Sequence, residues 1–462
     1  MKELLLNPLF LLLILSIGII YLGISYSLIS RNPRLAANLE KVCVIIFILV
    51  MAGLTWGPFR RLDPRFLVLH TTTMASIIGL LSIYGATLFV LFSRLFYTLK
   101  HSFYILVITI IENPFLFLLF FMMSLSMFWS EIPIVTLKHS LVFLGVTTVA
   151  GYIAKQYSWL EICRFIRWAT ALQVVLSLIM RNPGGKGWAG IYSHANGCGS
   201  HMGLAAALWI WYAVNYPKQR GLALGIAALS LLILQKTNSA GAKVQIVVYL
   251  GFLIYLQFVK KLPPQWGFVA VVLFLILFSI ATILLTENLE TIVVDILGKD
   301  MTFTGRRPIW ELLWEKKIKS HLWLGYGYYS FWQPWRGLND SGLVIMPNGY
   351  KVPNAHNGFM EILLDLGIIG LVLFLLSYLK TIASAILYMN QSKQPESVLP
   401  FLFIMYLIMP ALTNNRIVDF HDFWCYYIFV VVRVAIDLHE MNVHNKERSK
   451  MFNQQPSPES FT

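Results

Sequence analysis

The chain has 462 residues, of which 57% are hydrophobic and only 13% are charged, and its mean hydropathy is +0.67. Soluble domains carry roughly 25% charged residues, so this composition excludes an ordinary soluble protein and indicates one that spans a membrane. The net charge of +14 comes from lysines and arginines scattered through short loops, which is typical of orientation in a bilayer and argues against a nucleic-acid partner.

Apolar runs along the chain predict an all-α, polytopic integral membrane protein of about 12–13 transmembrane helices. The first run, residues 4–30, exceeds the roughly 20 residues that span a bilayer, and we interpret it as a retained helix, with a signal anchor as the alternative. The stretch 66–111 is long and interrupted by polar residues, so the helix count between 66 and 129 is open by one. The predicted segments fall near residues 5–29, 42–57, 66–93, 112–129, 134–153, 160–180, 198–216, 221–235, 241–258, 266–287, 358–386, 398–413 and 420–437.

The composition changes after residue 287. About 70 residues follow that are polar and rich in tryptophan and tyrosine, which suits either an aromatic belt at the membrane surface or stacking against sugar rings. The chain therefore divides into amino-terminal transmembrane helices (1–287), a long loop with a short amphipathic helix (288–357), carboxyl-terminal transmembrane helices (358–437) and a polar tail (438–462).

The polar tail orients the chain in the membrane. It is basic at its start and rich in Pro and Ser at its end, so we expect it to be disordered and cytoplasmic. Counting helices back from it places the loop 288–357 outside, on the same side as 181–197 and 235–241. The basic stretches 217–220 and 260–261 then fall inside, as the positive-inside rule requires.

Two adjacent arginines, Arg306 and Arg307, lie in the loop within TGRRPIW. Pro308 favours the first position of a helix, which the apolar spacing extends over about 308–318 along the membrane surface. A helix N-terminus offers free N–H groups to an anion, and guanidiniums grip phosphate oxygens bidentately. We interpret the pair as a diphosphate site, with lipid-headgroup anchoring as the alternative.

The stretch VPNAHNGFMEILLDLG begins the next long membrane helix. Asn354 or Asn357 is suited to cap it, and His356 lies at its outer mouth, where a neutral imidazole suits a general base. Glu361 and Asp365 are four residues apart on one face, and carboxylates at that depth face a cavity or a partner. Taken alone, His356 suits a structural hydrogen bond as well as catalysis.

Two further polar clusters fall on the same predicted side of the membrane. His194 and Asn196 lie beside glycines in GIYSHANGCGSH, and QKTNSAGAK brings Lys236, Ser239 and Lys243 to that face. One short motif of this kind is weak evidence. Four polar clusters that converge on one side of an apolar helical body indicate a site there.

The stretch DFHD, residues 419–422, carries potential metal ligands near the carboxyl end. No second acidic cluster accompanies it and the chain has no DxD pair, so we expect no bound metal. We expect Asp422 and Arg416 to line the external mouth instead.

Five motifs resemble, in this order, the O-antigen ligase and polymerase superfamily, especially its exopolysaccharide-production branch. The resemblance runs from about residue 113 to 386, and it implies a helical fold like that of C-type glycosyltransferases. It also implies an enzyme at the periplasmic face of the bacterial inner membrane, which moves a glycan from an undecaprenyl-diphosphate carrier to a glycan or a lipid A core. The motifs are SLSMFWSEIPIVTLKHSLVFLGVTTVAGYI, GIYSHANGCGSHMGLA, TNSAGA, TGRRPIW with WLGYGYYSFW, and AHNGFMEILLDLGIIGLVLF.

The resemblance assigns roles to individual residues. It implies that Arg306 holds the diphosphate, that His356 is the catalytic base, and that no metal or cofactor takes part. Beyond the resemblance, our working hypothesis is that Arg307 assists at the diphosphate, that Glu361 could orient the imidazole, and that His194, Asn196 and Asn357 support the site.

The chain departs from the branch in three places, one of which is KTNSA, where a Ser-Lys-Thr pattern is common in the branch. Ala195 stands between His194 and Asn196, where the branch has lysine, and Ala189 stands where it often has arginine. The second phosphate-binding cation is therefore open among three candidates, which are Arg181, Lys186 and Lys236.

Three functional alternatives follow. A polymerase and a ligase share the same donor chemistry and differ in their acceptor. A transporter or flippase would also use a basic pocket for an anionic lipid, although no internal repeat supports one. The departures at Ala189 and Ala195 leave an inactive family member as the third alternative.

Overall fold

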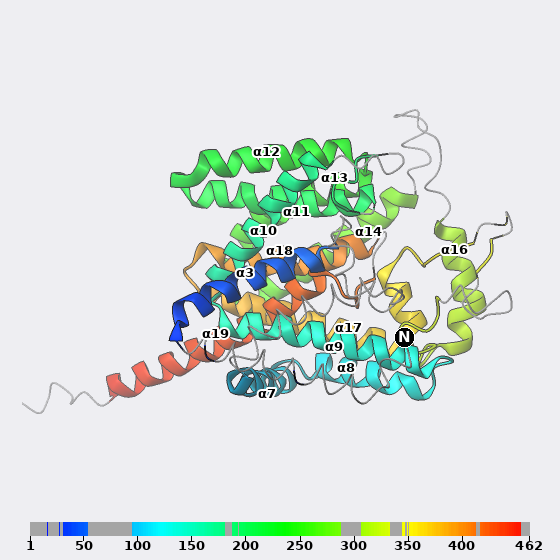
Figure 1. The fold of residues 1–462 in the computed structure, drawn as a ribbon, viewed down its shortest axis with the longest axis horizontal. Coiled ribbons are helices and arrows are strands. Elements are labelled where there is room, and N and C mark those ends of the chain that lie inside the picture. Colours follow the sequence, from blue (N-terminus) through cyan, green and yellow to red (C-terminus); the bar gives the residue numbers. More distant parts are fainter. Residues whose placement is uncertain are drawn as a thin grey trace, which may run out of the picture.

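The computed structural model describes residues 31–53, 95–180, 187–192, 194–287, 306–332, 344–346, 349, 351–412 and 416–453, together with Ser16 and Ser27. Within these ranges the regular elements are helices (Figure 1), and one isolated β-bridge joins Ile345 to Lys351. The α-helices are α3 (Pro33–Met51), α7 (Leu95–Glu112), α8 (Pro114–Leu125), α9 (Pro133–Gln156), α10 (Trp159–Ile179), α11 (Ala195–Asn215), α12 (Arg220–Lys236), α13 (Ala240–Val259), α14 (Pro264–Glu287), α16 (Arg306–Leu313), α17 (Gly358–Gln391), α18 (Leu399–Ala411) and α19 (Asp422–Asn453).

Short helical turns connect several of these helices. Four are 3₁₀ turns and one, which continues α16, is a π-helical turn. They are η1 (Ser126–Phe128), η2 (Pro217–Gln219), the π-helical η3 (Trp314–Ile318), η4 (Lys319–His321) and η6 (Pro395–Val398).

The described helices confirm the all-α, polytopic membrane class. Five of them are long and apolar enough to cross a bilayer, and a bent pair, α7 with α8, brings the number to six if it counts as one span. The predicted segments at 5–29 and 66–93 lie outside the described residues. The five are α9, α10, α12 together with η2, α13 and α17.

The region of uncertain helix count contains α7, which the sequence pattern did not separate. The chain bends by 114° between α7 and α8. Pro114 disfavours a helical conformation at the preceding residue, so the first helix ends there. The Asn113 side chain then ties the bend to α17, because its amide donates to the Ser377 carbonyl and the Thr381 hydroxyl, each at 3.2 Å.

The helix ends gather at two poles of the bundle. At one pole, Lys260 donates to the Ser392 carbonyl and the Ser397 hydroxyl, both at 3.3 Å. At the other, the Trp188 N–H donates to the Lys236 carbonyl at 3.1 Å. We call the pole with Trp188 and the start of α17 the site pole, and the one with Lys260 the opposite pole. The loops 181–197 and 235–241, which the sequence places on one side of the membrane, thus meet at the site pole. Which pole faces the periplasm stays a prediction.

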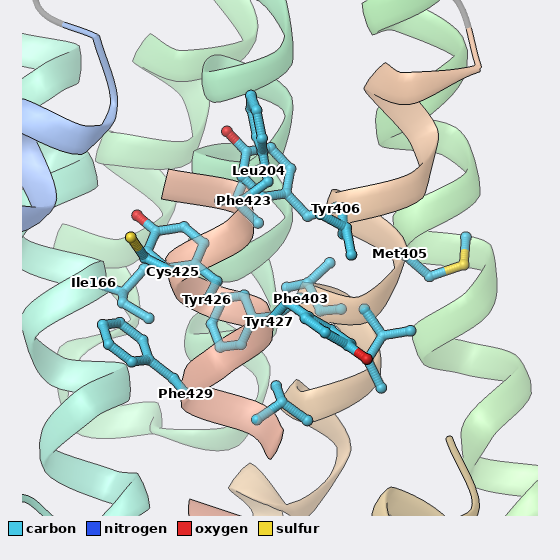
Figure 2. Close-up of a cluster of buried hydrophobic side chains, with 14 of the residues drawn as sticks. Ile166, Leu204, Phe403, Met405, Tyr406, Phe423, Cys425, Tyr426, Tyr427 and Phe429 are labelled. Carbon is cyan, nitrogen blue, oxygen red and sulfur yellow. The ribbon is translucent and has the colours of Figure 1, made fainter. Parts of the chain in front are cut away.

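The hydrophobic core lies where α18 and α19 pack against α10 and α11 (Figure 2). Every residue of α18 is buried, because this helix is apolar on all sides and no face is suited to water. Large rings fill the space around it, among them Tyr406, Trp424 and Tyr426, each at most 1% exposed. The two helices thereby form a rigid support for the site pole.

The described parts of the long loop form a cap over the start of α17. In Figure 1, α16 runs crosswise to α9 and α17, beyond their ends. The cap has a small hydrophobic cluster of its own, separate from the main core. Its buried members are Ile309, Leu313, Ile318, Tyr326, Phe331, Val344, Val352, Ala355, Leu363 and Leu364.

The cap is hydrogen-bonded to α17 at a break in that helix. The sequence pattern predicted a continuous helix over 358–386. Gly367 has φ 64° and ψ −166°, so the α17 backbone is not helical there. The break frees carbonyl groups that backbone N–H groups of the cap then bind, so the backbone polar groups are satisfied inside the protein. Two hydrogen bonds run from the cap to α17, Tyr326 N–H to Leu364 O at 2.8 Å and Gly327 N–H to Asp365 O at 2.9 Å. Two run from α17 to the cap, Ile368 N–H to Leu322 O at 2.8 Å and Ile369 N–H to Trp323 O at 3.4 Å.

Gly367→Ala is expected to destabilise the protein. A Cβ at Gly367 would lie 2.3 Å from the Trp323 carbonyl oxygen, and its positive φ alone costs an L-residue about 1–3 kcal/mol. The matched control is Gly251→Ala in α13, where nothing lies within 4 Å and the alanine should be neutral or stabilising. Thermal unfolding in detergent measures both variants, and equal midpoints would contradict the role given to the break.

The carboxyl-terminal helix is longer than expected. We predicted a membrane segment near 420–437 followed by a disordered tail, but α19 runs on to Asn453. Arg433 supports the continuation, because it pairs with Asp437 one turn later and with Glu440 at 3.5 Å. Residues 454–462 lie outside the described residues.

Candidate functional site

His356 lies directly before α17 in a constrained backbone. Of the two candidate caps, Asn357 is the one that caps the helix, since its side-chain oxygen accepts from Phe359 N–H at 2.9 Å and Met360 N–H at 3.2 Å. Asn354 instead accepts from the His356 N–H at 2.9 Å. His356 has φ 51°, a conformation uncommon for a residue other than glycine. Asn354 thus holds the His356 backbone directly, and Asn357 caps the helix that follows.

The preceding residue, Ala355, is fixed from both sides. Its N–H donates to Glu361 Oε1 at 2.7 Å, and its carbonyl accepts from Trp310 Nε1 at 2.9 Å. Ala355 is fully buried, so both bonds are shielded from water. The residue that carries the imidazole therefore follows a point anchored to α16 and to α17 at once.

The anchor through Trp310 ties α16, which begins with the arginine pair, to the segment that carries His356. We expected a helix that begins at Pro308, but α16 begins at Arg306, so Arg306 and Arg307 occupy its first turn. Proline is tolerated there because its missing N–H would have no partner within the helix. Arg306 precedes Trp310 by four residues, about one turn of the helix.

Below this anchor, one arginine binds both carboxylates of α17. Arg416 donates to Glu361 Oε2 at 2.7 Å and to Asp365 Oδ2 at 2.9 Å. The carboxylate side chains are only 4% and 5% exposed, and that of Arg416 is 13% exposed. Burial alone would lower the pKa of Arg416, but Asp365 and Glu361 outweigh it and raise this pKa well above its usual value. Arg416 thus stays cationic and neutralises charges that would be costly alone.

Glu361 binds the backbone of the segment that carries His356, through the Ala355 N–H. Its Oε2 also accepts from Trp332 Nε1 at 3.0 Å, so both of its oxygens are engaged. That Glu361 could orient the imidazole stays a prediction. In the structure its contacts hold the Ala355 N–H, and they position the segment that carries His356.

An aromatic stack joins the cap to α9 at the same place. The Tyr329 ring is stacked on His139 with centroids 4.2 Å apart, and the Arg416 guanidinium carbon lies 4.2 Å from the centre of the Tyr329 ring. The Tyr329 hydroxyl donates to Asp419 Oδ1 at 3.2 Å. Sequence reasoning missed His139 and Tyr329. The sequence shows a histidine in a largely apolar helix and a tyrosine in an aromatic loop. Neither feature indicates which residue the side chain contacts.

The second group of predicted residues also lies at the site pole. His194 and Asn196 are exposed at the start of α11, and Lys236 is exposed at the end of α12. The turn after α12 packs closely on the segment before α11, since a Cβ at Gly187 would lie 2.2 Å from the Thr237 carbonyl oxygen. The two segments that carry these residues therefore pack against each other. Lys186 falls outside the described residues.

The start of α19 connects the two groups. His201 Nε2 of α11 lies 3.3 Å from Asp422 Oδ2, and the Tyr406 hydroxyl donates to the same oxygen at 3.2 Å. We expected Asp422 to line the external mouth, but it is 1% exposed and packs inside the bundle. Its burial follows from these two partners, which supply the polar contacts that water would otherwise provide. The segment between Asp422 and Arg416 then leads to the carboxylates of α17.

The described ranges contain no group of three His, Cys, Asp or Glu side chains that could hold a metal ion. Among the predicted site residues, the cationic ones whose backbone lies at the site pole are Arg306, Arg307 and Lys236. They are suited to binding the oxygens of a phosphate directly.

Comparison with known proteins gives two matches. Residues 224–375 match the family model Wzy_C, described as O-antigen ligase, and this span contains α16, Arg306, His356 and Glu361. The chain is also 23% identical over 294 residues to the exopolysaccharide production protein ExoQ of Rhizobium meliloti (strain 1021). The matched stretch covers 60% of this chain and 66%, just under two thirds, of that protein. By these two matches, this multi-pass membrane protein is similar to the O-antigen ligase family and to an exopolysaccharide production protein.

Proposed function

We propose that this protein transfers a glycan from a lipid-diphosphate donor to an acceptor glycan, as a polysaccharide polymerase or ligase. The family match over 224–375 supports this class of reaction. The carrying observation is the anchor at Ala355, which fixes His356 beside the helix that begins at Arg306. A base for the acceptor and cations for the leaving group are the two parts that such a transfer needs.

In the proposed reaction the donor is an undecaprenyl-diphosphate-linked glycan. An acceptor hydroxyl oxygen forms a bond to the anomeric carbon, while the bond from that carbon to the diphosphate oxygen breaks. The lipid diphosphate leaves with the electron pair, and its charge is met by Arg306, Arg307 and a further cation, Lys236 or Lys186. The acceptor proton passes to His356.

The setting of His356 suits a base. It lies at the N-terminal end of α17, where the positive end of the helix dipole favours a neutral imidazole. Its side chain is half-buried, so an acceptor can reach it while much of the bulk water is excluded. The crosswise position of α16 (Figure 1) suits a diphosphate at the membrane boundary, where the headgroup of a lipid carrier resides.

Arg306→Ala is expected to reduce glycan transfer by about 10²–10³-fold and to weaken donor binding, because the guanidinium acts on the diphosphate before and during transfer. Arg306→Lys should fall between the alanine variant and the wild type, since an ammonium cannot form the bidentate fork. The assay uses purified protein in proteoliposomes with a synthetic lipid-diphosphate oligosaccharide, and it follows product length and donor binding.

Lys316→Ala is the matched control, since this exposed cation lies on the same cap. A parallel reaction in EDTA should run at the same rate. If folded Arg306→Ala retains wild-type transfer, the arginine pair anchors headgroups and the proposed site is wrong. A change in the sidedness of the donor without any change in glycan length would favour a flippase.

The site pole is expected to face the periplasm. Lys351→Cys, exposed at this pole, should react with an impermeant maleimide in intact spheroplasts, whereas Lys218→Cys at the opposite pole should react only after lysis. Both variants are built in a Cys43→Ser background, because Cys43 is partly exposed and the other three cysteines are buried. The reverse labelling would invert the topology and remove the proposed periplasmic site.

A further inference from the structure

A cavity of about 330 Å³ opens at the opposite pole, far along the helices from His356. It lies between the first half of α10, the last turns of α11 and the start of α18. Its volume is at the lower end of the roughly 300–1,000 Å³ typical of sites for small molecules. The proposed transfer reaction makes no use of it.

Two arginines of α10 line this cavity from one side. Arg164 and Arg167 are three residues apart and therefore lie on the same face of the helix. The Arg167 guanidinium carbon is 3.6 Å from the centre of the Tyr212 ring and 5.4 Å from that of Trp209, which fixes its plane. Its Nε is buried and has no hydrogen-bond partner among the described residues. A guanidinium held in this way is ready to bind an anion.

The cavity is positively charged overall. Glu396 is the carboxylate in its lining, and it accepts a hydrogen bond from the Tyr216 hydroxyl. Within the described part of the chain, neither Arg164 nor Arg167 forms an ion pair with it or with another carboxylate. Two cations and one carboxylate leave a net charge of +1 that no described side chain neutralises.

The position of the cavity indicates the source of the anion. Arg164 and Arg167 lie five and eight residues after Trp159, so they are roughly 8–12 Å from the start of α10. Next to them, Leu160 and Trp168 line the cavity and expose 41% and 44% of their surface. A cationic cavity that opens beside an exposed apolar face near the end of a membrane helix fits a lipid better than a soluble anion.

We propose that this cavity binds the phosphate of an anionic membrane lipid. The phosphate lies between Arg164 and Arg167, and an acyl chain follows the exposed apolar face of α10 past Leu160 and Trp168. Binding there ties α10 to α11 and to the start of α18. The proposal is independent of the transfer reaction at the site pole.

The test uses the full-length protein, purified and delipidated in detergent. Thermal unfolding and native mass spectrometry are followed with added phosphatidylglycerol, phosphatidylcholine or glycerol 3-phosphate. Phosphatidylglycerol should raise the unfolding temperature of the wild type and remain bound, because a ligand that binds the folded state stabilises it. The double variant Arg164→Gln/Arg167→Gln should bind this lipid at least about tenfold more weakly.

The matched control is Lys218→Gln, an exposed cation at the same pole that does not line the cavity, and it should respond as the wild type does. Should the double variant fail to fold, the exposed Arg164→Gln alone provides the comparison. An undiminished response in the variant overturns the site. An equal response to phosphatidylcholine overturns the need for an anion, and an equal response to glycerol 3-phosphate overturns the lipid.

Discussion

His356→Ala is expected to reduce glycan transfer by at least about 10²–10⁴-fold while donor binding stays near the wild-type value. In the proposed mechanism the imidazole acts on the acceptor proton alone, so its loss should affect the transition state and leave the diphosphate contacts intact. Arg306→Ala, in contrast, should reduce both quantities. Measurement of transfer and donor binding side by side in the two variants therefore separates their roles.

The backbone of His356 requires a second variant. Its φ of 51° is unfavourable for alanine, whereas asparagine adopts this conformation more readily. His356→Asn should therefore unfold at a higher temperature than His356→Ala and be equally inactive. His439→Ala, exposed far along α19, serves as the control for the loss of a histidine. Transfer that recovers in His356→Asn would show that the backbone matters and the imidazole does not.

Arg416→Met is expected to destabilise the protein by about 3–5 kcal/mol, the largest effect on stability among the substitutions considered. Methionine fills much of the same space but leaves Glu361 and Asp365 buried without their counter-charge. Thermal unfolding in detergent and the yield of monodisperse protein measure the loss.

The same site offers an internal control. Adding Glu361→Gln and Asp365→Asn to Arg416→Met removes the unpaired charges, so the triple variant should recover much of the lost stability. Arg416→Lys keeps one positive charge and should be intermediate, since an ammonium cannot contact both carboxylates as the guanidinium does. An Arg416→Met protein that unfolds at the wild-type temperature would remove Arg416 from the support of the site.

Much of the helical body follows from local sequence alone. The predicted segments 134–153, 160–180 and 241–258 correspond to α9, α10 and α13, because each is a long apolar run that ends at a proline or at polar residues. The start of α17 follows from Asn357, a residue type that caps helices. In each case neighbouring residues carry the information.

Features that depend on distant partners did not follow from the sequence. The break at Gly367 interrupts an apolar run that looks uniform, and its cause is the backbone of residues 322–327. Arg416 and Asp365 are 51 residues apart, and no sequence pattern near either residue identifies the other as its partner. The same holds for His139 and Tyr329. Sequence reasoning found the carboxylates and the histidine of the candidate site, and it missed the contacts that hold them.

The break at Gly367 also bears on the order in which the site is assembled. Residues 322–327 are synthesised before α17, and they bind carbonyl groups that become free only where this helix is interrupted. Newly made α17 can enter the bilayer as one continuous helix, with its own backbone hydrogen bonds complete. Docking of the earlier segment would then exchange some of those bonds for bonds to the cap. A chain that has inserted all its helices but has not yet made this exchange would have a membrane domain without an assembled candidate site.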